Sequence, residues 1–130
     1  MESDTQLLVL LPDQKVMMAF DAVFSTKDHA FTLAGHFDHW LAVLDELKKI
    51  EGYDLIITGH NVSTDRSALE ATAAYVRKAK DIHAQSKNGA SYASALKAAS
   101  PERANPGWAD FSGMFLSMAK PETNKELQNI

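Results

Sequence analysis

Apolar and polar residues follow one another along this chain in blocks that predict two strands, a helix, a third strand and three further helices. The first apolar run, Gln6–Leu11, stops at Pro12, and a second run extends from Lys15 to Phe24. Two apolar runs joined by a short polar turn are typical of a hairpin. Neither run alternates strictly between apolar and polar residues, which favours central strands covered on both faces.

Later blocks carry the helical period. Phe37, Trp40, Leu41, Leu44 and Leu47 recur at helical spacing, so we expect an amphipathic helix from Phe37 to about Lys49, ending near Gly52. Tyr53–Thr58 is the third predicted strand. The remaining predicted elements are helices at about Arg66–Gln85, Tyr92–Ala99 and Gly107–Met118, and a frayed tail over 121–130. Ser63 and Ser67 are alternative caps for the first of these helices.

This order of elements predicts one α/β domain spanning residues 1–130, with a small mixed sheet and its helices on one face. Three strands are few for this class. The helices leave the other sheet face open, and the strands are apolar enough to need a cover there. The pattern therefore predicts an apolar sheet face that the helices do not cover.

Composition narrows the chemistry. The net charge is −4 and there is no basic cluster, which disfavours nucleic acid as a partner. Cysteine is absent, so any metal ligands must be imidazole or carboxylate. No apolar stretch approaches the ~20 residues of a membrane span, and the N-terminus is acidic, unlike a signal peptide. We expect a soluble, cytoplasmic protein without membrane contact.

Two residues are the strongest candidates for chemistry. Asp21 lies inside the apolar run Val16–Phe24, and His60 follows Gly59 directly after the apolar run Leu55–Thr58. A carboxylate in a buried strand needs a hydrogen bond, an ion pair or a cation. A metal ion shared with His60 meets that need; the alternative is that Asp21 caps a turn at the end of its strand. Because zinc takes three or four protein ligands, the two residues make half a site.

Other signals favour structure over chemistry. His36-Phe37-Asp38-His39 resembles the latter part of the H-x-H-x-D-H metal motif, but Ala34 stands where its first histidine belongs, and the segment opens an amphipathic helix. We expect its polar side chains to face solvent or cap the helix. Phosphate loops and nucleophile elbows are missing, and no catalytic residue or general base is predicted. The aromatic residues Trp40, Trp108, Phe111 and Phe115 are expected in the core.

The order of segments resembles the second half of the metallo-β-lactamase superfamily, over about residues 5–100. The resemblance rests on the strand, proline turn and second strand ending at Asp21, and on Gly59-His60-Asn61, which looks like that family's Gly-His-Gly turn. Four further segments match in order: His29 with Phe31, the Trp-containing run Asp38–Leu47, Ala74–Val76, and Lys87–Tyr92. The pattern is most similar to the glyoxalase-II-like and quinoprotein-relay-like hydrolases. Phe20 and Asn61 replace the glycines usual at their positions.

This resemblance implies the C-terminal half of an αββα sandwich. Asp21 would match the carboxylate that bridges two metal ions, and His60 the histidine that binds the second, with zinc, iron or manganese as the metal. The reaction would be metal-dependent hydrolysis, but the residues before Leu7 are too few to hold the remaining ligands, so we expect the chain to be inactive alone. Its partner would be a complementary N-terminal half or a second copy. The alternative is a non-catalytic module that dimerises or binds a partner through the uncovered sheet face.

Overall fold

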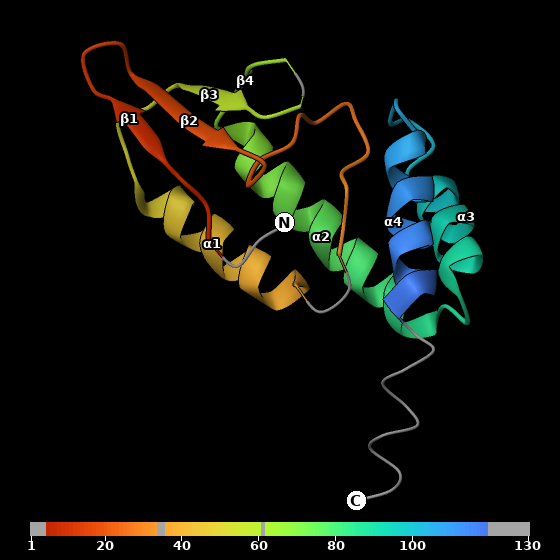
Figure 1. The fold of residues 1–130 in the computed structure, drawn as a ribbon. Coiled ribbons are helices and arrows are strands. Elements are labelled where there is room, and N and C mark those ends of the chain that lie inside the picture. Colours follow the sequence, from red (N-terminus) through yellow and green to blue (C-terminus); the bar gives the residue numbers. More distant parts are fainter. Residues whose placement is uncertain (1–4, 34–35, 61, 120–130) are drawn as a thin grey trace, which may run out of the picture.

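The computed structural model describes residues 5–33, 36–60 and 62–119 of the chain. These residues form a mixed α/β structure, as the sequence predicts (Figure 1). In chain order the elements are β1 (Val9–Leu11), β2 (Val16–Phe20), α1 (Phe37–Lys49), β3 (Leu55–Thr58), β4 (Thr64–Asp65), α2 (Ser67–Gln85), α3 (Gly89–Ala99) and α4 (Gly107–Ala119). The two-residue strand β4 was not predicted, because its Thr-Asp sequence carries no apolar signal.

The four strands form one mixed sheet in the order β1-β2-β3-β4. The predicted hairpin is present, since β1 pairs antiparallel with β2. Strand β3 pairs parallel with β2, with α1 as the crossover between them, and β4 pairs antiparallel with β3. Because β2 and β3 are parallel, their carboxyl ends meet at the same edge of the sheet. This edge carries the residues that follow each strand, Asp21 and Gly59-His60.

Helices α1 and α2 cover one face of the sheet (Figure 1). On that face Met17, Ala19 and Ile56 are buried, and they belong to the same apolar core as Trp40 and Leu44 of α1. The Trp40 indole Nε1–H also donates to the Ala22 carbonyl at 2.8 Å, which ties α1 to the segment that follows β2. Burying large side chains such as these contributes about 1.5–3 kcal/mol each.

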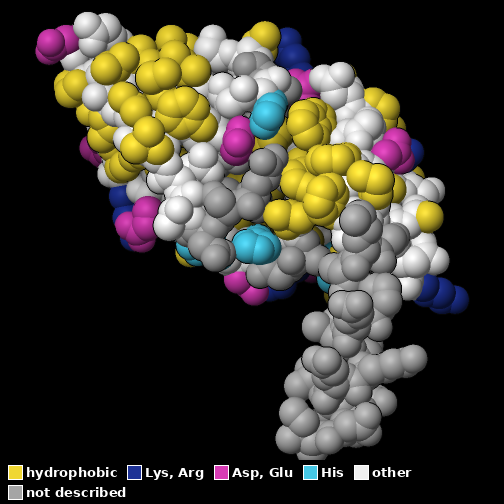
Figure 2. Space-filling view, viewed as in Figure 1, with side chains coloured by type: hydrophobic (Ala, Val, Ile, Leu, Met, Phe, Trp, Pro, Cys, Tyr) yellow, Lys and Arg dark blue, Asp and Glu magenta, His cyan; other side chains and the backbone are white. Residues whose placement is uncertain are grey.

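The opposite face of the sheet is apolar and is not covered by the helices. Residues that are paired directly across neighbouring strands point to the same side, and the register therefore places six aliphatic side chains together. They are Val9, Leu11, Val16, Met18, Leu55 and Ile57. All six are partly or largely exposed. We call this set the outer sheet face; Figure 2 shows hydrophobic side chains gathered over the strands.

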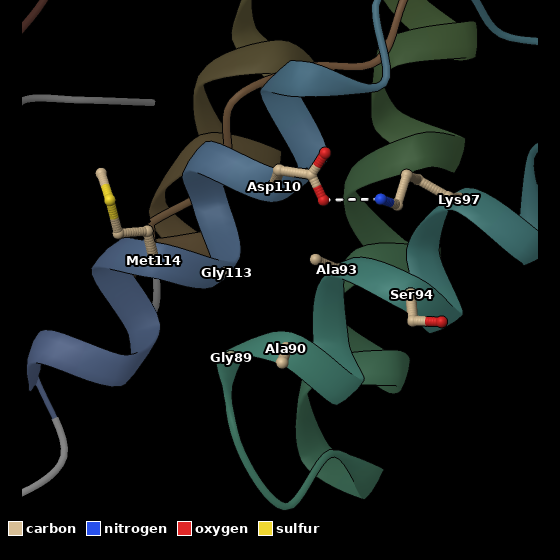
Figure 3. A pocket seen from close by; sticks show the side chains of 8 residues that line it. All are labelled: Gly89, Ala90, Ala93, Ser94, Lys97, Asp110, Gly113 and Met114. Atoms are coloured by element: carbon tan, nitrogen blue, oxygen red, sulfur yellow. Dashed lines mark hydrogen bonds and ion pairs between the residues drawn. The ribbon is translucent and has the colours of Figure 1, made fainter.

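Helices α3 and α4 pack side by side beyond α2, with small residues at their contact (Figures 1 and 3). A Cβ atom added at Gly113 would lie 2.3 Å from the Gly89 carbonyl oxygen and 2.9 Å from the Ala93 Cβ. Such spacing requires glycine at position 113. Across the same groove, Lys97 Nζ and an Asp110 carboxylate oxygen form an ion pair at 2.6 Å. The pair joins the two helices near one end of the contact.

Some predicted boundaries were wrong. Helix α3 begins at Gly89, three residues before Tyr92, because the Asn88 and Ser91 side chains form a reciprocal capping box. Neither Ser63 nor the Ser67 side chain caps α2; the Ser67 backbone N–H donates instead to the Asp65 carboxylate at 2.8 Å. The predicted frayed tail, 121–130, lies outside the described residues. Among the described residues, no helix combines the length and hydrophobicity needed to cross a membrane.

Candidate metal centre

Asp21 and His60 meet at the carboxyl edge of the sheet. The Asp21 Oδ1 and His60 Nε2 atoms are 3.2 Å apart. Their side chains are partly open to solvent, with 25% of Asp21 and 38% of His60 exposed. Strands β2 and β3 therefore bring these two groups to one place, although Asp21 is less buried than its apolar neighbours suggested.

Gly59 makes this close approach possible. A Cβ atom at position 59 would lie 2.0 Å from Asp21 Oδ1 and 3.3 Å from the Asp21 backbone nitrogen. No side chain fits between the two strand ends, so any residue other than glycine would displace the carboxylate. The sequence signal, a glycine directly before the histidine, has this physical reason.

Phe20 holds an uncommon backbone conformation beside the pair. Its φ is +48°, in the left-handed region that glycine favours and that bulky residues rarely adopt. The pairing of β2 with β3 also shifts register between Met18 and Phe20, which marks a bulge at the strand end. A strained residue of this kind costs about 1–3 kcal/mol and is common at functional sites. The position is the one at which glycine would be expected from the resemblance.

Aromatic rings surround His60 on two sides. The Phe24 ring stacks on the imidazole with a centroid distance of 6.2 Å and an interplanar angle of 23°. The Trp108 ring approaches from α4 with a centroid distance of 5.0 Å and an angle of 54°. An open hollow of about 400 Å³ lies beside the pair and is lined by Gln6, Leu7, Phe20, Asp21, Gly59 and His60. The pair is thus held on a firm apolar support and faces an accessible space.

The donor atoms fit a divalent ion in part. Two ligands bonded to one zinc ion at ~2.0–2.2 Å lie about 3–3.6 Å apart, and the 3.2 Å separation falls in that interval. Carboxylate oxygen and imidazole nitrogen also suit zinc, iron or manganese. Within the described residues, however, no group of three or more metal-binding side chains exists. The same separation allows a hydrogen bond from His60 Nε2–H to Asp21.

The segment His36-Phe37-Asp38-His39 behaves as the sequence indicates. Asp38 and His39 are exposed at the start of α1, and the Asp38 carboxylate pairs with Lys80 Nζ of α2 at 2.5 Å. His36 occupies the N-cap position without a side-chain capping bond. Among the described residues, these side chains form no metal-binding group with Asp21 and His60.

A buried polar network was missed by sequence reasoning. His29 Nδ1 lies 2.9 Å from the Tyr75 hydroxyl, and the Arg103 guanidinium lies 4.6 Å from the centroid of the Tyr75 ring. Arg103 Nη1 also donates to the Asp28 carbonyl at 2.5 Å. Burial, together with the Arg103 charge, lowers the pKa of His29 below its ordinary value. Since its members lie 46 and 75 residues apart, no local pattern could have revealed the network.

The aromatic prediction was right for Trp40 and wrong for the end of the chain. Trp40 is 1% exposed, whereas Phe111 and Phe115 are 40% and 38% exposed, and Trp108 is partly exposed. Helical spacing identified a cluster but could not tell whether another element covers it. These rings form part of the surface near His60.

Comparisons with known proteins give no family assignment: neither a scan against protein-family models nor a search of curated proteins finds a match to this chain.

Proposed function

We propose that this chain is the half-domain of a metal-dependent hydrolase that contributes Asp21 and His60 to a dinuclear site. The observation that carries the proposal is the 3.2 Å approach of these two side chains at the carboxyl edge of a mixed sheet. Two neighbouring residues support the proposal. Gly59 leaves room for the carboxylate, and Phe20 adopts a strained backbone next to it.

Asp21 and His60 are too few ligands for a complete zinc site. Two ligands are fewer than the three or four that zinc takes from proteins, so the remaining ligands would come from polypeptide packed on the outer sheet face. That face is apolar and ends at the same edge as Asp21 and His60. A second sheet laid against it would complete the αββα sandwich that the resemblance implies. The chain alone would bind an ion weakly and would lack hydrolytic activity.

The roles of the two residues follow from their chemistry. Asp21 would hold the ion or ions through its carboxylate oxygens, and His60 would bind through Nε2, kept in place by the Phe24 and Trp108 rings. A bound divalent ion would lower the pKa of water toward ~7 and polarise the bond to be hydrolysed. The other described residues that line the hollow beside the pair carry no acid or base, so the chain's own contribution is to bind and orient.

The proposal is tested by NMR titrations that detect metal binding at Asp21, His60 and their neighbours. In ¹H–¹⁵N spectra of the purified chain, substoichiometric Mn²⁺ should broaden the signals of residues 20–24 and 58–60 first. In a separate titration followed by ¹H–¹³C spectra, zinc should shift the His60 ring signals. Asp21→Ala should abolish both effects, and His60→Ala should abolish the Mn²⁺ broadening.

His39→Ala is the matched control, because His39 is an exposed histidine on α1. Its titrations should be indistinguishable from those of the unaltered chain. Equal Mn²⁺ broadening in the Asp21→Ala and His60→Ala variants, or broadening centred on α1, would contradict the proposal and leave the pair as a simple hydrogen bond.

A second candidate function is favoured by the outer sheet face. Six aliphatic side chains on one sheet face form the kind of surface that marks a protein interface. In this alternative the chain is a non-catalytic module that dimerises or binds a partner through this face. Self-association in the absence of metal, together with metal titrations that leave Asp21 and His60 unchanged, would favour the module.

A further inference from the structure

Four aromatic rings from two segments form a continuous cluster beside the candidate metal centre. Phe31 lies in the segment before α1, and Trp108, Phe111 and Phe115 lie on α4. The Phe31 centroid is 6.3 Å from that of Trp108, 4.9 Å from that of Phe111 and 5.5 Å from that of Phe115. We call these four rings the aromatic ledge. Its tilted and edge-on contacts are those that aromatic rings prefer.

The ledge is open to solvent on one side. Phe31 is 4% exposed and forms its base, whereas Phe111 and Phe115 are 40% and 38% exposed, and their neighbour Met114 is 50% exposed. In Figure 2, histidine and acidic side chains lie between the hydrophobic side chains over the strands and a second hydrophobic area over α4. Large apolar groups gathered in this way mark a binding surface more often than scattered ones do.

The ledge borders a hollow of small-molecule size. Asn105, Gly107, Trp108 and Phe111 line a space of about 480 Å³. This volume lies within the ~300–1,000 Å³ typical of sites for small molecules. Of the four described residues that line it, two are aromatic, one is glycine, and none is charged. Asn105 is held in place because its Nδ2–H donates to the Asp28 carboxylate at 2.5 Å.

Trp108 connects this hollow to the candidate metal centre. Its ring lines the hollow and also lies 5.0 Å from the His60 ring, which lines the neighbouring hollow with Asp21. A ligand seated on Trp108 and Phe111 therefore lies against a ring that contacts His60. The Trp108–His60 contact links the linings of the two hollows.

We propose that the aromatic ledge is a binding subsite for the aryl group of a small ligand whose carboxylate or ester group extends toward Asp21 and His60. Rings bound edge-on or offset against Trp108 and Phe111 gain stacking energy as well as burial, which favours an aryl group over an aliphatic chain. An oxygen-bearing arm matches the divalent ion assigned to the pair. As a substrate site, the ledge rests on the proposed metal function; as an aryl-binding site, it does not.

The experiment uses sodium 2-naphthoate and the metal-free chain, followed by ¹H–¹⁵N spectra. We expect saturable shifts of the Trp108 indole N–H and of the backbone amides of residues 105–111. The Trp40 indole N–H, which is buried and bonded to the Ala22 carbonyl, should not move. Zinc should then increase the affinity for naphthoate at least about threefold, and Asp21→Asn should remove only this increase.

Two variants, one on the ledge and one at the rim of its hollow, keep the proposal falsifiable. Phe111→Ser should weaken naphthoate binding at least about fivefold, and it should fold because Phe111 is 40% exposed. Gly107→Leu adds bulk at the rim of the hollow, where a Cβ atom meets nothing within 4 Å, and should weaken binding similarly. Leu11→Ser, on the outer sheet face, is the matched control and should leave naphthoate affinity unchanged.

The outcomes separate this proposal from the metal function. Naphthoate binding at Trp108 in a chain that shows no metal response at Asp21 and His60 would overturn the proposed function and retain the aryl site. Shifts centred on β1 and β2 would overturn the aryl site, and so would a naphthoate affinity in both variants equal to that of the unaltered chain. So would shifts of the Trp108 signal that grow with protein concentration alone, because the occupant would then be a second copy of the chain.

Discussion

At the scale of single residues, the site depends on two backbone properties that no side-chain inventory reveals. Gly59 matters because it has no Cβ atom, and Phe20 because its φ is +48°. Both act on Asp21, from the neighbouring strand and from the preceding residue. The position of the Asp21 carboxylate therefore depends on the absence of a Cβ atom at Gly59 and on the strained backbone of Phe20, as well as on its own burial.

Gly59→Ala should separate site geometry from fold stability. The added Cβ atom would lie 2.0 Å from Asp21 Oδ1, so the carboxylate must turn away from His60. We expect the zinc-induced shift of the His60 ring to disappear, while the free energy of unfolding falls by about 1–2 kcal/mol, since a side chain can move more cheaply than backbone. NMR titration and urea denaturation measure the two effects.

Gly107→Ala is the control for this substitution. A Cβ atom there meets nothing within 4 Å, and the residue begins α4. Stability should be equal or slightly higher, because alanine favours helix, and the His60 response should be unchanged. A Gly59→Ala variant that keeps the full zinc response would show that Asp21 does not take part in binding.

His29 should make the stability of the fold depend on pH. Burial and the Arg103 charge lower its pKa below 6.5, so the folded chain binds a proton there less readily than the unfolded chain. The contribution is therefore fully present above pH 6.5 and is lost as pH falls from 6.5 through the lower pKa of His29 in the folded chain. Urea midpoints at pH 7.5 and pH 5 should show a smaller loss in His29→Gln than in the unaltered chain.

His39→Gln provides the comparison, since His39 is exposed on α1. Its midpoint should fall between pH 7.5 and pH 5 as much as that of the unaltered chain. An undiminished fall in His29→Gln would show that other groups carry the acid sensitivity.

Local sequence signals singled out Asp21 and His60. Asp21 interrupts one apolar run and His60 follows another, and the parallel pairing of β2 with β3 brings the two residues together. Arg103 gave no such signal, because its partners Asp28 and Tyr75 lie far away in the sequence. Phe111 and Phe115 have the spacing of core residues, and only the arrangement of the helices decides that they remain exposed.

At the scale of elements, the α3–α4 pair positions Trp108 next to His60. The two helices contact through Gly89, Ala93 and Gly113, which leaves the helix backbones close together (Figure 3). The Lys97–Asp110 pair crosses the same groove at 2.6 Å, but it is partly exposed and contributes about 0–1 kcal/mol. The close approach at Gly113 therefore constrains the position of α4 more than this ion pair does.

Gly113→Ala should push α4 away from α3. The new Cβ atom would lie 2.3 Å from the Gly89 carbonyl oxygen, which is backbone and cannot rotate aside. We expect a loss of about 2–3 kcal/mol in the free energy of unfolding, as for other overpacked contacts. Weaker naphthoate binding at Trp108 should accompany it. Urea denaturation measures the first effect.

Gly107→Ala again serves as the comparison, because it makes the same chemical change on the same helix in open space. Equal stability of the two variants would mean that α4 can move without cost, and the close contact would then not position Trp108.

Element boundaries followed from sequence where apolar periodicity was strong and failed where side-chain capping decides. The bounds of α1 are those predicted, because apolar residues mark its inner side throughout. The start of α3 was misplaced because the Asn88–Ser91 capping box begins the helix before its first aromatic residue. Strand β4 needs β3 as its partner, and its own two residues give no sign of it.

At the scale of the whole molecule, two apolar surfaces lie on either side of the Asp21–His60 pair. The outer sheet face is broad and aliphatic, whereas the aromatic ledge is a small group of rings that borders a hollow. The first has the character of a protein interface and the second that of a small-molecule site. A metal centre between them would draw ligands from a protein on one side and substrate from the other.

Charge placed on the outer sheet face should distinguish these surfaces. Leu11 and Leu55 are 38% and 40% exposed and lie across β2 from each other on this face. The double variant Leu11→Lys/Leu55→Lys should shift the chain toward monomer in sedimentation velocity, because two ammonium groups would have to be buried in any sheet-to-sheet contact. Its free energy of unfolding should change by less than about 1 kcal/mol, since both positions are exposed.

Val62→Lys, at a 71% exposed position outside the paired strands, is the control and should leave the association state as it is in the unaltered chain. If the double variant associates as strongly as the unaltered chain, the interface lies elsewhere, and the aromatic ledge becomes the surface to test next by the same measurement on Phe111→Ser.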